Sequence, residues 1–233
     1  MTEPEKLHAG LEYDMWAPEI DALKLRAMTL CRRLNALPKE AKEERTAVMR
    51  ELFGSVGENA AVMPYFSCDD GKSIFIGKNF LANYNVSILD RAPVRIGDYV
   101  MIGPHTLIAT VNHPISPMGR RKHLSVAKPV TIGNDVWIGQ NVTIMPGVHI
   151  GDGAIIGTNA TVASDIPQYS IAAGNPAKVI RRRFDDEMID LLERLQWWNR
   201  PIEEVDKLIP ILSNPDIAQA KIDIAEYLRI QYD

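Results

Sequence analysis

The chain has 233 residues, of which 46% are hydrophobic and 24% charged, and its formal net charge at pH 7 is -4. This composition is typical of a globular protein and disfavours a chain that is disordered throughout, while the acidic balance disfavours a nucleic-acid-binding domain. The two cysteines, Cys31 and Cys68, are too few for a disulfide framework, and no apolar run approaches the roughly 18 residues of a membrane span. The acidic N-terminus has no apolar core and predicts no signal peptide. We therefore expect a cytoplasmic protein with neither a membrane nor a nucleic acid as partner.

Two helices are predicted in residues 1–56, which we expect to form an N-terminal helical cap. Apolar residues step by three or four positions between Pro18 and Pro38, as on one face of a helix. A second apolar stripe runs from Val48 to Phe53, and Gly54 is a candidate C-terminal cap. The charged stretch between the helices, residues 39–45, is predicted to be solvated.

The stretch from residue 132 to residue 162 places an aliphatic side chain at every sixth position: Ile132, Ile138, Ile144, Ile150, Ile156 and Val162. A helix repeats every 3.6 residues and a flat strand every second residue, so a period of six fits neither as a continuous element. It is typical of a parallel β-helix, in which three six-residue units make one triangular coil. Glycine follows four of these residues and is expected to permit the turns.

We predict a mainly β fold, with the β-helix as a catalytic domain over residues 57–183. The six-residue step also occurs before residue 109, is absent from residues 109–131, and resumes at residue 132. An interruption inside a repeat array is typical of a loop extruded from the coils, and such loops tend to carry function. This loop contains His113-Pro114, and an exposed imidazole is suited to exchanging a proton near neutral pH. From the residues alone, a catalytic His113 and a surface His113 without a role both remain open.

Helical periodicity returns in residues 184–233, which we predict as a C-terminal helical tail. Asp185 is a candidate N-cap, and Phe184 and Ile189 a candidate hydrophobic staple. The basic run from Lys178 to Arg183 precedes this tail, and either a phosphorylated ligand or solvent could lie against it.

Several motifs together resemble the sugar O-acetyltransferases of the maltose and galactoside type. They are "DMWAPEIDALKLRAM", "LFGSVGENA", "FSCDDG", "NFLANYNVSILD", "TVNHPISP", "KPVTIGNDVWIGQNVTIMPGVHIGDGAIIGTNATV" and "AAGNPAKVI". The tail sequence "RFDDEMIDLLERLQWWNRPIEEVDKLIPIL" is similar to the C-terminal helices of the streptogramin (xenobiotic) acetyltransferases. The resemblance implies a left-handed coil, a homotrimer, and acetyl-CoA as cosubstrate, with a small-molecule hydroxyl acceptor meeting it between subunits and no metal.

The resemblance also implies roles for individual residues. His113 matches the general base of the family, and Asp14, Ser67 and Asn83 match acceptor-site positions, with Asn83 also holding the catalytic region in place. A further family carboxylate that binds galactoside falls at Arg91, beside Asp90, which puts galactoside specificity in doubt. The CoA contacts of the family match Trp137, Gln140, Thr158, Ala163, Ser164, Lys178 and Arg181.

Three alternatives stand beside a sugar O-acetyltransferase. The tail favours a streptogramin-like xenobiotic O-acetyltransferase as the runner-up. A gamma-type carbonic anhydrase, another hexapeptide trimer, would need His105, His113 and His149 as zinc ligands. A non-catalytic hexapeptide trimer would keep the coils without the chemistry.

Overall fold

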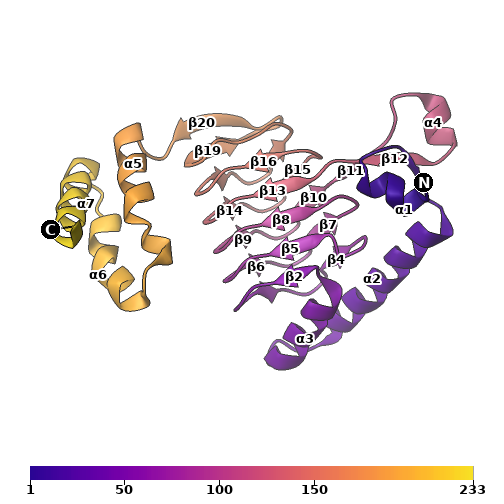
Figure 1. The fold of residues 1–233 in the computed structure, drawn as a ribbon, viewed down its shortest axis with the longest axis horizontal. Coiled ribbons are helices and arrows are strands. Elements are labelled where there is room, and N and C mark those ends of the chain that lie inside the picture. Colours follow the sequence, from indigo (N-terminus) through magenta and orange to yellow (C-terminus); the bar gives the residue numbers. More distant parts are fainter. Residues whose placement is uncertain (233) are drawn as a thin grey trace. The chain divides into compact units, whose positions relative to one another are not determined.

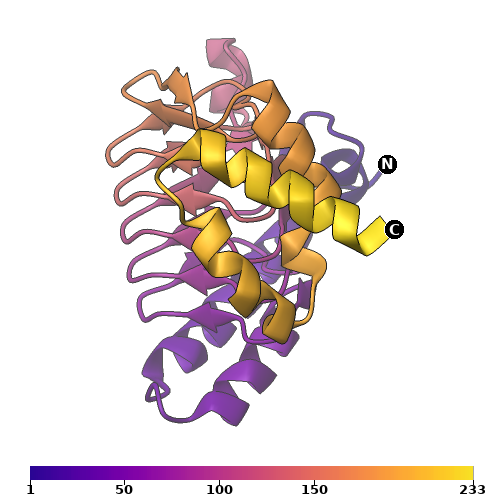
Figure 2. The same cartoon turned by 90° about the vertical axis from the view of Figure 1, so that its left-hand side faces the viewer.

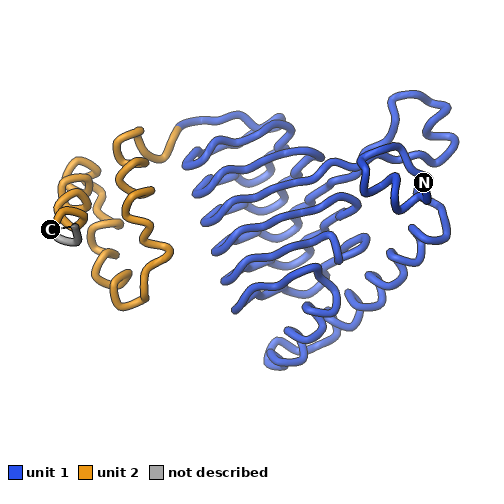
Figure 3. The backbone as a smooth tube through the Cα atoms, in the orientation of Figure 1, with its two compact units in different colours: residues 1–181 blue, residues 182–233 orange. Residues whose placement is uncertain are grey.

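A computed structural model describes the backbone of residues 1–232 and the side chains of residues 1–229. The chain divides into two compact units, unit 1 over residues 1–181 and unit 2 over residues 182–233 (Figure 3). Unit 1 contains the coils and the N-terminal helices, and unit 2 contains the C-terminal helices (Figure 1).

Unit 1 is built on a parallel β-helix, which confirms the predicted fold class. Very short strands stack into three sheets, named here I, II and III, and every strand from β2 to β10 and from β13 to β19 pairs in parallel with its neighbours. Sheet I contains β4 (Ser67–Cys68), β7 (Ser87–Leu89), β10 (Leu107–Ala109), β15 (Thr143–Ile144) and β18 (Thr161–Val162). Sheet II contains β2 (Ser55–Val56), β5 (Ile74–Ile76), β8 (Val94–Ile96), β13 (Val130–Ile132) and β16 (His149–Ile150). Sheet III contains β3 (Ala61–Val62), β6 (Leu81–Ala82), β9 (Met101–Ile102), β14 (Trp137–Ile138), β17 (Ile155–Ile156), β19 (Ser170–Ala173) and β20 (Lys178–Arg182).

The six-residue step follows directly from this stacking. Ile138 pairs with Ile102 of the coil before it and with Ile156 of the coil after it, and each of these side chains is buried. The six aliphatic residues from Ile132 to Val162 are each no more than 1% exposed. The chain runs through sheets II, III and I in turn, so successive turns of the same kind lie above one another (Figure 2). We call these columns of turns the III–I corner and the I–II corner.

The glycines of the repeat serve a different purpose from the one predicted. Gly139 does not adopt a positive φ; the turn residue that does is Asn141, at +53°. A Cβ on Gly139 would lie 2.7 Å from the backbone nitrogen of Thr158 in the next coil. The glycine is therefore required by the close approach of stacked coils, and asparagine, which tolerates the left-handed region, makes the turn.

The N-terminal cap consists of α1 (Glu3–His8), α2 (Pro18–Ala36) and α3 (Lys42–Leu52). The predicted α2 and α3 are present, with Phe53 rather than Gly54 as the C-cap of α3. The prediction of a solvated stretch at residues 39–45 is wrong at Arg45, which is 8% exposed. Arg45 donates to the carbonyls of Leu34 and Leu37 at the end of α2, so burial of its guanidinium is compensated by hydrogen bonds.

The interruption at residues 109–131 is an ordered excursion from the I–II corner. It contains β11 (Val111–Asn112), α4 (Pro117–Arg121) and β12 (Leu124–Ala127). The N-terminal strand β1 (Tyr13–Asp14) pairs antiparallel with β12, which also pairs antiparallel with β11. This small sheet fixes the segment before α2 against the excursion.

Unit 2 consists of α5 (Asp186–Leu195), the 3-10 turn η1 (Trp197–Asn199), α6 (Ile202–Leu212) and α7 (Ile217–Tyr232). The N-cap predicted at Asp185 is present, because its carboxylate accepts from the backbone nitrogen of Met188 at 3.0 Å. Leu191, Leu192 and Leu195 of α5 are buried, whereas Ile202 and Ile209 of α6 are exposed. Among residues 1–232, no helix combines the length and apolar character needed to cross a bilayer.

Candidate active site

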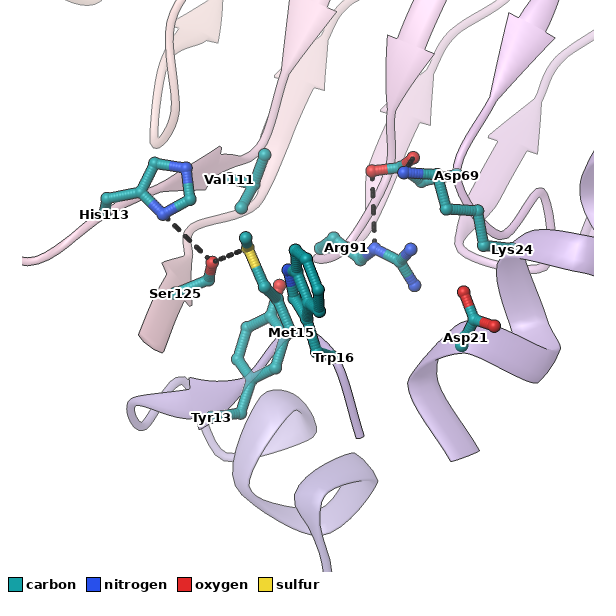
Figure 4. A pocket seen from close by; sticks show the side chains of 10 residues that line it. All are labelled: Tyr13, Met15, Trp16, Asp21, Lys24, Asp69, Arg91, Val111, His113 and Ser125. Carbon is teal, nitrogen blue, oxygen red and sulfur yellow. Dashed lines mark hydrogen bonds and ion pairs between the residues drawn. The ribbon is translucent and has the colours of Figure 1, made fainter. Parts of the chain in front are cut away.

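A cavity of about 500 Å³ opens in unit 1 where the small antiparallel sheet meets α2 and the I–II corner (Figure 4). The side chains that line this cavity come from parts of the sequence that are more than one hundred residues apart. The lining residues are Tyr13, Met15, Trp16, Asp21, Lys24, Asp69, Arg91, Val111, His113 and Ser125. The pairing of β1 with β12 brings the segment before α2 to this cavity.

His113 follows β11 and is held by β12. Its Nδ1 lies 3.2 Å from Oγ of Ser125 (Figure 4). The same nitrogen lies 3.3 Å from the carbonyl oxygen of Leu124. A carbonyl oxygen can only accept, so the contact with Leu124 favours the tautomer that carries its proton on Nδ1. Nε2 makes no hydrogen bond to the residues that the structure describes, and in this tautomer it keeps a lone pair. The arrangement suits a proton acceptor.

Ser125 also lines the cavity beside His113, although it was not predicted as a site residue from the sequence. It lies on β12 opposite Tyr13, is 0% exposed, and has its Oγ 3.3 Å from the sulfur of Met15 as well as 3.2 Å from His113. No motif marks this serine, and the antiparallel pairing of β11 with β12, in which Asn112 lies opposite Val126, places it beside the imidazole.

The wall opposite His113 carries charge. Nε of Arg91 lies 3.3 Å from Oδ2 of Asp69, and Nζ of Lys24 lies 3.7 Å from Oδ1 of the same carboxylate. Asp90 fixes the turn that presents Asp69, because its buried carboxylate accepts from the backbone nitrogens of Asp69, Asp70 and Gly71. Burial raises the pKa of Asp90 to about 7, although hydrogen bonds from backbone N–H groups act in the opposite direction.

The predicted acceptor residues do not all reach this cavity. Asp14 belongs to β1, between two lining residues, and its carboxylate accepts from the backbone nitrogen of Trp16 at 2.9 Å. Ser67 lies on the outer face of sheet I, with its Oγ 2.8 Å from Oγ of Ser87. Asn83 follows β6 at the III–I corner, and its side chain accepts from the backbone nitrogen of Tyr84. Only His113 of the predicted catalytic and acceptor residues lines the cavity.

The predicted CoA contacts form three groups along the coils. Gln140 and Thr158 lie on the III–I corner, the column that also contains Asn83, and Trp137 lies on the adjoining face of sheet III with its side chain 57% exposed. Ala163 and Ser164 follow β18 at the I–II corner, the column from which the His113 excursion leaves. Lys178 and Arg181 are exposed on β20.

The three histidines of the carbonic anhydrase alternative are dispersed in the single chain. His105 lies in a turn of the III–I corner, His149 lies on the outer face of sheet II, and His113 lines the cavity. Within the described residues, no group of three or more His, Cys, Asp or Glu side chains is arranged to hold a metal ion.

Two family descriptions match the chain. Residues 6–57 match the maltose acetyltransferase hexapeptide capping motif, and residues 129–164 match six repeats of the bacterial transferase hexapeptide. The first match covers the N-terminal cap, and the second covers the coils that follow the excursion.

Two curated relatives cover different shares of the chain. The galactoside O-acetyltransferase of Escherichia coli is 40% identical over 183 residues, which are 78% of this chain and 89% of the relative. The sophorolipid acetyltransferase of Starmerella bombicola is 35% identical over 227 residues, which cover 94% of this chain and 84% of the relative. The second alignment therefore extends into unit 2.

Solved structures give the same result for the fold. A maltose O-acetyltransferase from Clostridium difficile superposes with a TM-score of 0.77 at 38% identity, covering 79% of this chain and 99% of that one. A hexapeptide-repeat acetyltransferase from Vibrio cholerae, solved with acetyl coenzyme A, gives a TM-score of 0.72 at 41% identity, covering 79% of this chain and 100% of that one. The chain belongs to the acetyl-CoA-dependent hexapeptide-repeat acetyltransferases of the maltose and galactoside type.

Proposed function

We propose that the protein transfers the acetyl group of acetyl-CoA directly to a hydroxyl of a sugar or sugar-like acceptor, with His113 as general base. The observation that carries this proposal is the position of His113 in a cavity, with Nδ1 engaged and Nε2 left without a partner among the described residues. The names of two relatives, a galactoside and a sophorolipid acetyltransferase, support an acceptor of this class.

The reaction then has one chemical step on the enzyme. Nε2 of His113 takes the proton of the acceptor hydroxyl while its oxygen attacks the thioester carbonyl carbon. The carbon–sulfur bond breaks, and the departing thiolate of CoA receives the proton, so the products are the acetyl ester and free CoA. Both cysteines are buried and neither lines the cavity, which favours direct transfer over a covalent acetyl-cysteine.

We propose a homotrimer in which each site is completed by a second copy. In one chain, His113 leaves from the I–II corner, whereas Asn83, Gln140 and Thr158 lie on the III–I corner. The resemblance assigns all four residues to one reaction, and a ring of identical chains can place one corner against the other. Trp137, Ala163, Ser164, Lys178 and Arg181 are proposed to contact CoA in that groove, and Asp14 and Ser67 to contact the acceptor. Because Cys31 and Cys68 are free thiols, we place the protein in the cytoplasm.

The test compares His113→Ala with His149→Ala. The first variant should lose at least about 100-fold in kcat, as expected for loss of a general base, and still bind CoA. The second removes an exposed imidazole from the outer face of sheet II and should keep the wild-type rate. Thiol release from acetyl-CoA with a panel of sugars, glycolipids and streptogramins gives the readout. Near wild-type turnover by His113→Ala would reject the general base, and a large loss in His149→Ala would favour the zinc alternative.

A further inference from the structure

Cys31 and Cys68 form a pair of buried thiols that the proposed reaction does not use. Cys31 lies on α2, Cys68 ends β4, and their sulfur atoms are 3.6 Å apart. The sulfur atoms of a disulfide are about 2.05 Å apart, so the two atoms would need to approach by about 1.5 Å. Side-chain rotation and a small displacement of α2 can supply a movement of this size. The two thiols are therefore close enough to be oxidised to a disulfide without unfolding of the chain.

Hydrogen bonds on both sides of the pair hold α2 against β4. Asn35, one turn after Cys31, donates to the carbonyl of Phe66 at 2.9 Å and accepts from the backbone nitrogen of that residue at 3.0 Å. On the other side of the pair, Arg26 donates to the carbonyl of Asp70 at 3.3 Å. The helix therefore runs antiparallel to residues 66–70, and the thiols face one another between two fixed points. This arrangement lowers the entropy that formation of the bond would cost.

The contact between the two sulfur atoms makes the thiols unequal. When Cys31 is ionised, the Cys68 thiol donates to its sulfur, and this hydrogen bond lowers the pKa of Cys31 although burial acts in the opposite direction. The same hydrogen bond and burial raise the pKa of Cys68. Cys31 therefore ionises first, and the thiolate is the form that oxidants attack. Because the two residues are only 5% and 7% exposed, the oxidant must be small and uncharged, as hydrogen peroxide is.

A bond between these cysteines would close a loop around the terminal coil of the β-helix. The chain between them contains α3 and the strands β2 and β3, and β4 ends at Cys68. The strands β2, β3 and β4 are each the last in their sheets, so the coil that they form has a neighbouring coil on one side only (Figure 1). Such an end is where a stack of repeats opens first. A covalent bond across this segment restricts its unfolded conformations and so stabilises the end of the stack.

We propose that Cys31 and Cys68 are a reversible modification site, at which a peroxide forms a disulfide that locks the terminal coil. The Cys31 thiolate attacks one peroxide oxygen, the oxygen–oxygen bond breaks, and the products are a sulfenic acid on Cys31 and hydroxide, which takes up the proton that Cys31 had released. The sulfur of Cys68 then attacks the sulfenic sulfur. The sulfur–oxygen bond breaks, the disulfide forms, and the proton of Cys68 leaves with the hydroxide as water. Two thiols are thus oxidised while hydrogen peroxide is reduced to two molecules of water, and a dithiol reductant restores the thiols.

The test treats the native full-length protein with a small excess of hydrogen peroxide. Alkylation under denaturing conditions and mass spectrometry should then find peptides joined through Cys31 and Cys68, with neither thiol alkylated. The cysteines are 37 positions apart, and closure of a loop of this length should raise the melting temperature by about 5–15 °C, an increase that dithiothreitol reverses. Amide hydrogen exchange should slow in β2 and β3 and stay unchanged in β15 and β17, which have neighbouring strands on both sides.

Matched variants separate this bond from other effects of the peroxide. Methionine oxidation is not reversed by dithiothreitol, and the double variant Cys31→Ala/Cys68→Ala keeps every methionine and should show no rise in melting temperature. Cys68→Ser retains a hydroxyl donor beside Cys31, so Cys31 should accumulate as a sulfenic acid that dimedone traps, whereas Cys31→Ser should react far more slowly. Wild type measured before and after dithiothreitol decides the question even if a variant folds poorly. Thiols that join only after unfolding, a disulfide only between chains, or a disulfide that leaves melting and exchange unchanged would overturn the inference.

Discussion

Replacing Ser125 by alanine tests whether the buried contact with His113 positions the base. The hydroxyl lies 3.2 Å from Nδ1, but Nδ1 also has the carbonyl of Leu124 at 3.3 Å. The tautomer therefore keeps one of its two supports. A neutral hydrogen bond contributes about 0.5–1.5 kcal/mol net, which corresponds to about a 2- to 10-fold change in rate. We expect Ser125→Ala to lower kcat by that factor, far less than the loss expected for His113→Ala.

The assay is steady-state acetyl transfer with both substrates varied. A positioning role lowers kcat and leaves the KM for acetyl-CoA unchanged, because Ser125 lines the cavity of His113 rather than the proposed CoA groove. Ser170→Ala is the matched control, since Ser170 is 1% exposed and its hydroxyl donates to a carbonyl, that of Gln168 at 3.3 Å, on sheet III. A loss in Ser125→Ala as large as that in His113→Ala, or no loss at all, would refute the reasoning.

Three further predictions concern the coil, one buried carboxylate and the assembly. Ile138→Ala leaves a cavity between stacked coils and should lower the free energy of unfolding by about 2–5 kcal/mol, measured by denaturation, whereas Thr143→Ala on the outer face of β15 should cost under about 1 kcal/mol. Because the pKa of Asp90 is raised from 3.8 to about 7, the folded state retains this proton to higher pH than the unfolded state. The contribution of Asp90 to stability should therefore fall as pH rises from about 4 to 7, so the pH dependence of the melting temperature should differ between wild type and Asp90→Asn in that range; an unchanged slope contradicts this. If sites form between copies, co-refolded His113→Ala and Asn83→Ala chains should recover about a quarter of wild-type activity, because mixed trimers restore one intact site each; no recovery would argue against shared sites.

The β-helix could be predicted because its core depends on one spacing. Each coil places side chains such as Ile132, Ile138 and Ile144 inward from three faces, so the sequence repeats every six residues wherever the turns between strands keep the same length. The N-terminal helical cap could be predicted only in part from the sequence. Helix α1 begins with a capping box, Thr2 with Glu5, but it is too short to show an apolar periodicity. Arg45 was misassigned because a single arginine in a charged stretch gives no sign that helix-end carbonyls will surround it.

The candidate site was only partly predictable from the sequence. One of its residues lies in an interruption of the repeat, whereas others are brought to it by the pairing of strands that are distant in the sequence. His113 could be identified from its place in an interruption of the repeat. Trp16 reaches it through the antiparallel pairing of β1 with β12, and Ser125 through that of β11 with β12, and neither pairing follows a period or leaves a motif in the sequence. Arg91 reaches the cavity from the turn between β7 and β8. A resemblance could assign Ser67 and Asn83 to the reaction, but it could not say that they lie outside this cavity in the single chain.

The position of Asn83 can nevertheless be worked out by counting coils, and the count shows that Asn83 and His113 belong to different corners of the single chain. Ala82 pairs with Ile102, and Ile102 with Ile138, so the turns after these residues form one column, the III–I corner. Ile88 pairs with Ile108, and Ile108 with Ile144, so the turns after these strands form the other column, from which the excursion with His113 leaves. The full width of sheet I separates the two columns, and stacking more coils cannot bring them together. A rigid prism can unite residues from two of its corners only by placing another prism beside it, which makes a shared site the arrangement most consistent with the proposed roles of both residues.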